Sequence, residues 1–114
     1  MKQVLFIEIG MGVDLQGQDV TKASIRAVRD AIGHNYLPGM RKLVDGDSSR
    51  MLVHVRLGVP PEAGIPDLAA VKASLPHGTV SVECVPGGML VPGHLDNGRI
   101  CIVNAAIEVA VEGA

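Results

Sequence analysis

IGMGVDLQGQD, residues 9–19, is the stretch that decides the fold of this chain. It follows the apolar run Val4–Ile9, which is typical of a central strand, and precedes Val20–Ile32, which has a helical pattern that Asp19 can cap. We therefore predict that this stretch forms the first strand-to-helix turn. Its three glycines indicate either positive φ angles or a close approach to another part of the molecule.

The same turn is a candidate ligand-binding site. A helix N-terminus presents free N–H groups, which bind carboxylate or imide oxygens. The predicted binding residues are Gly10, Gly12, Asp14, Gln16 and Gly17. Their spacing does not match the dinucleotide fingerprint, and no Gly-Lys-Ser/Thr follows as in a phosphate loop. The alternative is that the glycines serve only the backbone.

Composition restricts the class of protein. The chain has 114 residues, 12 acidic and 10 basic side chains, and a net charge of −2, which excludes a basic nucleic-acid-binding surface. We predict one domain, residues 1–114, in a cytoplasmic protein with no membrane segment and reduced cysteines. A hydrophobic share of 47% with two aromatic residues favours a homo-oligomer, because a small domain can bury little apolar surface.

The remaining elements follow from apolar periodicity. Strands are expected at 51–57, 79–85 and 100–111, with 89–91 resuming the third strand after a Pro-Gly-Gly interruption. A helix capped by Asp67 precedes Pro76. The order β-α-β-α-β-β predicts an α+β fold: a two-layer domain whose four-stranded mixed sheet carries its helices on one face.

Strand alternation assigns side chains to the two faces of this sheet. The face beneath the helices is predicted to carry Leu5, Val53, Val82 and Val103. The other face receives polar and apolar residues together: Glu8, His54, Arg56, Ser81, Glu83, Asn104 and Glu108 beside Val4, Phe6, Leu52 and Ile102. A face of this mixed kind predicts packing against another subunit, with the polar groups at the seam.

Candidate catalytic residues lie on that mixed face. Glu8 and Glu83 are predicted to transfer protons, because partly buried carboxylates have raised pKa values. The alternative is that each pairs with Arg56, which is otherwise expected to hold a ligand carbonyl or carboxylate. Ser81 is a candidate nucleophile, with His54 or Lys22 as its base.

No metal or cofactor is predicted. Asp14, His54, His94 and Asp96 are the possible ligands, but the chain has no close-spaced pair such as H-x-x-x-H or C-x-x-C.

The glycine stretch resembles a known signature. A small uncharacterised protein family of bacteria and plants has the pattern GxGxDxHG, which is similar to GMGVDLQG, residues 10–17. The likeness continues through residues 19–32, Leu-Pro-Gly at 37–39, Leu-Gly-Val-Pro at 57–60, Leu-Pro-His-Gly at 75–78 and the Gly87-Gly88 turn, and covers most of the chain. Gln16 stands where the signature has histidine.

More distantly, the element order resembles one repeat of the ring-opening amidohydrolases, cyanuric acid hydrolase and barbiturase. Those enzymes resemble three fused copies of a small α+β unit, with serine and lysine pairs where the copies meet. The resemblance implies that a free-standing unit is a trimer, and it makes Gly87 and Gly88 candidate ligand-binding residues. In that family serine precedes the Gly-Gly pair, whereas here Pro86 does.

Two functional hypotheses are consistent with these features. In the first, the protein is a homo-oligomer, expected to be a trimer, that binds a small polar or anionic molecule at subunit interfaces and hydrolyses a cyclic amide. In the second, it is a non-catalytic assembly or regulatory module whose polar face satisfies its own hydrogen bonds. The first predicts stabilisation by a small ligand, and the second predicts none.

Overall fold

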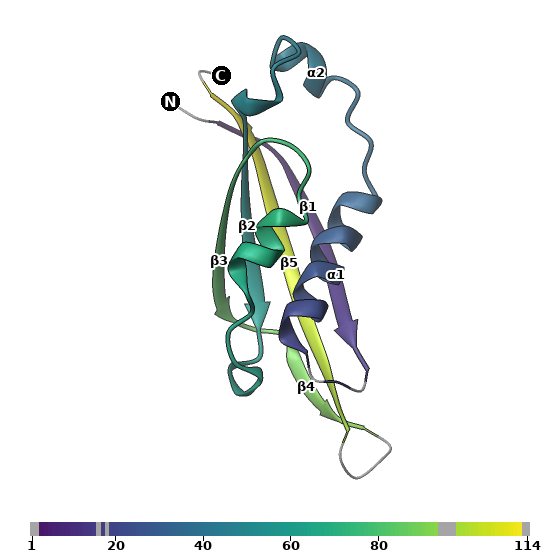
Figure 1. Cartoon of the computed structure of the whole chain (residues 1–114). Helices are drawn as coiled ribbons and strands as arrows, with labels where there is room; N and C mark the ends of the chain where they lie inside the picture. The colour runs from purple at the N-terminus through teal and green to yellow at the C-terminus, as the bar shows by residue number, and fades with distance from the viewer. Residues whose placement is uncertain (1–2, 16, 18, 94–97, 113–114) are drawn as a thin grey trace.

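A mixed five-stranded sheet carries all the helices on one face in the computed structural model, which describes residues 3–15, 17, 19–93 and 98–112 (Figure 1). The strands are β1 (Gln3–Asp14), β2 (Met51–Val59), β3 (Thr79–Pro86), β4 (Met89–Pro92) and β5 (Arg99–Val111). The helices are α1 (Val20–Gly33), α2 (Met40–Leu43) and α3 (Leu68–Ala73). The predicted α+β class and the two-layer arrangement are confirmed.

The strand order is β1-β5-β2-β3, with β4 paired to β5 beside this path. Within the described residues, β2 and β3 pair in parallel, whereas β1, β2 and β4 each pair antiparallel with β5. The sequence predicts four strands, because the pattern at 89–91 indicates a continuation of the strand at 79–85. Gly88, at a φ of 59°, turns the chain instead, and β4 then pairs with β5.

The predicted faces of β2, β3 and β5 are confirmed by burial. Val55 and Leu57 of β2 and Val103 and Ile107 of β5 are almost completely buried beneath the helices. Val82 of β3 packs against this core. These strands alternate without interruption, so residues of one parity all face the helices.

The predicted face of β1 is wrong from Phe6 onward, whereas Val4 and Leu5 lie on their predicted sides. The register with β5 shifts between Val4 and Phe6, and this irregularity reverses the alternation. Glu8, placed on the open face by the sequence, is therefore buried on the helix side. Ile7 and Ile9 were predicted to lie beneath the helices together with Leu5. They are instead 63% and 72% exposed on the open face.

The first two glycines lie in β1 and not in a turn, because β1 continues to Asp14. A Cβ at Gly10 would come within 2.5 Å of the carbonyl oxygen of Ala27, and one at Gly12 would overlap the backbone of Ala23. These glycines therefore allow α1 to pack closely on the strand, the second of the two uses that the sequence allowed. Asp19 caps α1 as predicted, accepting hydrogen bonds from the backbone of the first turn.

The molecule is elongated, with extents of 53 × 23 × 19 Å. Gln3 of β1 pairs with Val111 of β5, so β1 starts and β5 ends at the same pole, near α2 (Figure 1). Among the residues described, no helix has the length and apolar character needed to cross a membrane.

Candidate functional site

The uncovered face of the sheet gathers five polar residues, which we call the open-face cluster: His54, Arg56, Ser81, Glu83 and Glu108. Parallel pairing sets His54 beside Ser81 and Arg56 beside Glu83, while antiparallel pairing sets His54 beside Glu108. Four of the five were predicted as site residues. Glu108 was placed on this face by the alternation of its strand but was not predicted to belong to the site.

Contacts within the open-face cluster form one connected network. The Oγ atom of Ser81 lies 2.7 Å from Nδ1 of His54, and Nε2 of the same ring lies 3.5 Å from Oε2 of Glu83. Arg56 donates from Nε to Oε1 of Glu83 at 2.5 Å and from a terminal nitrogen to Glu108 at 3.4 Å. A hollow of about 150 Å³ lies against His54, Ser81 and Glu108.

The ionic partners determine the charge states of this cluster. Hydrogen bonding to Arg56 lowers the pKa of Glu83, and the same bond raises the pKa of the guanidinium. The prediction of a raised pKa for Glu83 is therefore wrong, because the carboxylate has an ionic partner and is not deeply buried. The alternative, that Glu83 pairs with Arg56, is the one observed.

An apolar strip borders the open-face cluster. Val4, Ile7, Ile9 and Met11 project from β1 on the same face and are 39%, 63%, 72% and 53% exposed. Across the sheet, Ile7 stands in register with Glu108 and Ile9 with Ala106, so apolar and polar halves lie side by side. The mixed face that the sequence predicted is present. Val4 belongs to it as predicted, and Ile7, Ile9 and Met11 take the place of Phe6.

Ser81, His54 and Glu83 are arranged like the three groups of a nucleophilic site: a hydroxyl nucleophile, its base and a carboxylate that orients the base. His54 is within reach of the Ser81 proton, and ionised Glu83 can stabilise the imidazolium that would form. Arg56 is shared by two carboxylates, so its charge is already neutralised within the cluster.

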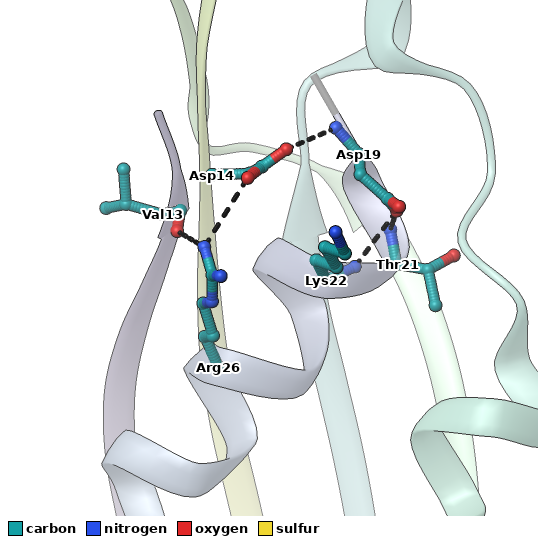
Figure 2. A network of polar contacts seen from close by, with 6 residues as sticks. All are labelled: Val13, Asp14, Asp19, Thr21, Lys22 and Arg26. Atoms are coloured by element: carbon teal, nitrogen blue, oxygen red, sulfur yellow. Dashed lines mark hydrogen bonds and ion pairs between the residues drawn. The ribbon is translucent and has the colours of Figure 1, made fainter. Parts of the chain in front are cut away.

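Asp14, predicted to bind a ligand, connects the end of β1 to the start of α1 (Figure 2). Its Oδ2 accepts the backbone N–H of Asp19 at 2.8 Å, and its Oδ1 lies 3.4 Å from Arg26, which also donates to the carbonyl of Val13. A Cβ at Gly17 would come within 2.9 Å of Asp14 Oδ2. Both carboxylate oxygens are thus occupied by the protein itself.

Glu8 lies apart from the open-face cluster, on the opposite side of the sheet. It is 8% exposed, and burial raises the pKa of its carboxyl group, as the sequence predicted. The predicted alternative, pairing with Arg56, is wrong for Glu8, because the two side chains project from opposite faces. The sequence signal that would have placed it correctly is the pair Gly10 and Gly12, which share its parity and must face α1.

The second glycine pair also serves the backbone. A Cβ at Gly87 would come within 2.8 Å of the Cα of Gly58, and the N–H of Gly87 donates to the carbonyl of Val59. Gly87 and Gly88 therefore let two chain segments cross at the end of β2. No ligand is needed to explain them.

Other candidate ligands do not converge. Gln16, His94 and Asp96 lie outside the described residues. Within the part of the chain that the structure describes, no three His, Cys, Asp or Glu side chains are grouped to hold a metal ion. Cys84 and Cys101 are both unpaired, and burial raises the pKa of each thiol.

Comparison with solved structures agrees with this fold. The crystal structure of an FtsZ-like protein of unknown function from Nostoc punctiforme is similar, with a TM-score of 0.87 and 37% sequence identity over 98% of each chain. No curated protein matches the chain. Residues 4–109 match the model of a family described as conserved hypothetical proteins, Lin0512. This chain therefore belongs to the Lin0512 family.

Proposed function

We propose that this chain is the subunit of a homo-oligomer that binds a small polar molecule where the open sheet faces of neighbouring copies meet. The observation that carries the proposal is that the apolar strip of β1 stands beside the open-face cluster on one uncovered sheet face, with Ile7 in register with Glu108. An interface built over both would bury the strip and enclose the cluster.

Association is supported by the exposure of the apolar strip. Three of its four side chains are more than half exposed, and they stand on alternate positions of one strand. Each fully buried aliphatic side chain contributes about 1.5–3 kcal/mol relative to exposure, so a second copy that covers the strip gains substantially. The resemblance to a triple-repeat enzyme favours three copies.

The charge of the open-face cluster favours a neutral ligand over an anion. Two carboxylates, Glu83 and Glu108, surround one guanidinium, so an incoming anion would meet net negative charge. A cyclic amide or imide is neutral and offers both carbonyl acceptors and an N–H donor. We therefore narrow the ligand class from polar or anionic molecules to neutral cyclic amides.

The hydrolytic form of the proposal uses Ser81 and His54. Ser81 Oγ attacks the ring carbonyl carbon, and its proton passes to His54. The ring C–N bond then breaks and the departing nitrogen takes that proton, which leaves an acyl ester on Ser81. Water hydrolyses the ester with the same base, releasing the ring-opened acid and restoring the serine. Glu83 stabilises the transient imidazolium.

A non-catalytic assembly is the second candidate, and one observation favours it. Each side chain of the open-face cluster already has a partner within that cluster. A cluster of this kind can serve only to orient neighbouring subunits. This candidate predicts a stable oligomer whose unfolding is unaffected by cyclic amides.

Light scattering across a dilution series tests the assembly first. A trimer has a mass of about 36 kDa, three times the 11.9 kDa chain. A monomer at all concentrations contradicts both candidates. If the protein is an oligomer, two assays with succinimide and hydantoin separate the two candidates. Thermal unfolding detects binding, because a ligand at a hundred times its Kd adds about 2.7 kcal/mol to the free energy of unfolding. Titration of the ring-opened acid detects hydrolysis.

Ser81→Ala then tests the catalytic step. It should abolish release of the ring-opened acid while leaving the mass and the ligand-induced stabilisation unchanged. Ser49→Ala, at an exposed position of the short 3-10 helix Ser48–Arg50, is the matched control. Hydrolysis that survives in Ser81→Ala contradicts the proposed nucleophile. Stabilisation without hydrolysis in the wild-type protein leaves binding as the function and removes the catalytic step.

A further inference from the structure

A cavity of about 240 Å³ lies on the helix side of the sheet, opposite the face that carries the open-face cluster. Its walls are mostly apolar and come from the end of α1, from α2 and from the sheet, with Ile32, Met40, Met51 and Ile107 among them. Ligand pockets typically measure about 300–1,000 Å³, so an occupant of this cavity is small.

Glu8 is the charged side chain of this cavity. Its residue is 8% exposed, and among the described residues its carboxylate makes no hydrogen bond or ion pair. No side-chain oxygen of the described residues is both fully enclosed and unpartnered, so the Glu8 carboxylate faces the open space of the cavity. A largely buried carboxylate without a protein partner is disfavoured in its charged form, whereas one that receives N–H donors or a cation is stabilised. The remaining polar lining residues are His77 and Asn35, and the amide nitrogen of Asn35 is already committed to the carbonyl of Ala31 at 2.8 Å.

The position of the cavity adds a second preference for positive charge. Ile32 and Asn35 line it at the C-terminal end of α1, a helix of 14 residues. The C-terminus of a helix carries a partial negative charge from its unpaired carbonyl groups, which favours cations. The Glu8 carboxylate and the C-terminal end of α1 therefore both favour a positively charged ligand.

We propose that this cavity binds a small primary amine with a compact apolar body, whose ammonium group is held by Glu8. The apolar walls accommodate the body of the ligand, and the three N–H donors of the ammonium satisfy a carboxylate that otherwise lacks a partner. An anionic ligand of the same shape is repelled by Glu8. A neutral one gains only the apolar contacts.

This site does not depend on the function proposed above, because the two lie on opposite faces of the sheet. Ile9→Asp, which places a charge on the apolar strip, should therefore leave amine binding unchanged whether or not the protein associates. Failure of one proposal is thus distinguishable from failure of the other.

Three probes with one ring and different head groups test the proposal: benzylamine, benzyl alcohol and benzoate. Isothermal titration at pH 8 keeps the amine cationic. We expect saturable binding of benzylamine, at least tenfold weaker binding of benzyl alcohol, and the weakest binding for benzoate. Equal affinity for the three probes, a preference for benzoate or no binding of any probe overturns the proposal.

Glu8→Gln isolates the contribution of the charge. It should weaken benzylamine binding at least tenfold and leave benzyl alcohol binding unchanged, while Glu83→Gln, on the open face, alters neither. Ile32→Phe, which fills the cavity from α1, should weaken both ligands. Circular dichroism verifies that each variant is folded. Unchanged benzylamine affinity in folded Glu8→Gln contradicts the site.

Discussion

Gly12 of β1 lies directly against the backbone of Ala23 in α1, with no room between them for a Cβ atom. Four residues further along the helix, Ala27 meets the same glycine and also Gly10. The spacing between helix and sheet is therefore determined by backbone contact at two glycines and by the small alanine face of α1. Close packing of this kind cannot relax by a change of rotamer.

Gly12→Ala should destabilise the protein strongly. Overpacking a core by a methyl group ordinarily costs about 1–3 kcal/mol, and here the obstacle is backbone, so we expect a loss of about 3 kcal/mol or more. Urea unfolding followed by circular dichroism measures the change.

Gly33→Ala is the matched control, because a Cβ at Gly33 meets nothing within 4 Å and its φ is not positive. At the end of α1 this substitution should be neutral or stabilising by roughly 0.5–1 kcal/mol. Equal effects of the two substitutions would contradict the packing role assigned to Gly12.

Asp14→Ala should destabilise the chain by about 1–3 kcal/mol, because it leaves the backbone N–H of Asp19 without its acceptor. Arg26→Ala should cost less, since that ion pair spans 3.4 Å and the arginine side chain is 51% exposed. Glu62→Ala, at an exposed turn, provides the control, with an expected change within about 0.5 kcal/mol. A small effect of Asp14→Ala, equal to that of Glu62→Ala, would leave Asp14 available for a ligand.

Ile9→Asp should reduce the solution mass to that of the monomer, 11.9 kDa. The side chain is 72% exposed at the middle of the apolar strip, so a carboxylate there is tolerated by the free chain but would be desolvated in the interface. Ile65→Asp, at an 83% exposed position in the loop before α3, should leave the mass unchanged. Light scattering at matched concentrations measures both, and a wild-type mass for Ile9→Asp would exclude the open face as the interface.

Folding stability should depend on pH through Glu8. Burial raises the pKa of its carboxyl group above the ordinary 4.5, so the folded chain binds this proton more tightly than the unfolded chain. The stability contributed by protonated Glu8 is complete below pH 4.5 and is lost as the pH rises through the folded-state pKa. Glu8→Gln should therefore gain stability relative to wild type as the pH rises from 4.5 to neutrality.

Glu83→Gln provides a control of opposite sign. Arg56 lowers the pKa of Glu83, so this carboxylate contributes stability above its unfolded pKa and loses it as the pH falls. Urea unfolding of wild type and both variants at several pH values gives the two differences. If they had the same pH dependence, the assigned environments would be wrong.

The gathering of the open-face cluster could be predicted from the sequence. His54 and Arg56 share a parity in β2, as do Ser81 and Glu83 in β3, and uninterrupted alternation puts each pair on one face. What the sequence did not determine was the partner of each charge. Arg56 proved to be shared between two carboxylates because the register aligns it with Glu83 and brings Glu108 within reach.

The face of β1 could not be obtained from alternation alone. In the first half of β1, apolar side chains occupy both odd and even positions, so the pattern does not show which side faces the helices. The irregularity between Val4 and Phe6 then reverses the predicted sides. The decisive information was in Gly10 and Gly12, which were assigned to a turn. Because α1 packs closely only against residues without a side chain, Gly10 and Gly12 must face the helix. Glu8, two residues before Gly10, then lies on the same buried side.

The pairing of Gln3 with Val111 places the start of β1 beside the end of β5. Because these residues are direct neighbours in the sheet, a linker of a few residues can join them without disturbing any strand. A circular permutant opened in the polar turn at residues 45–47 should then retain the sheet. By the same geometry, copies arranged around a symmetry axis could be joined in tandem at this pole, each unit keeping its own five strands.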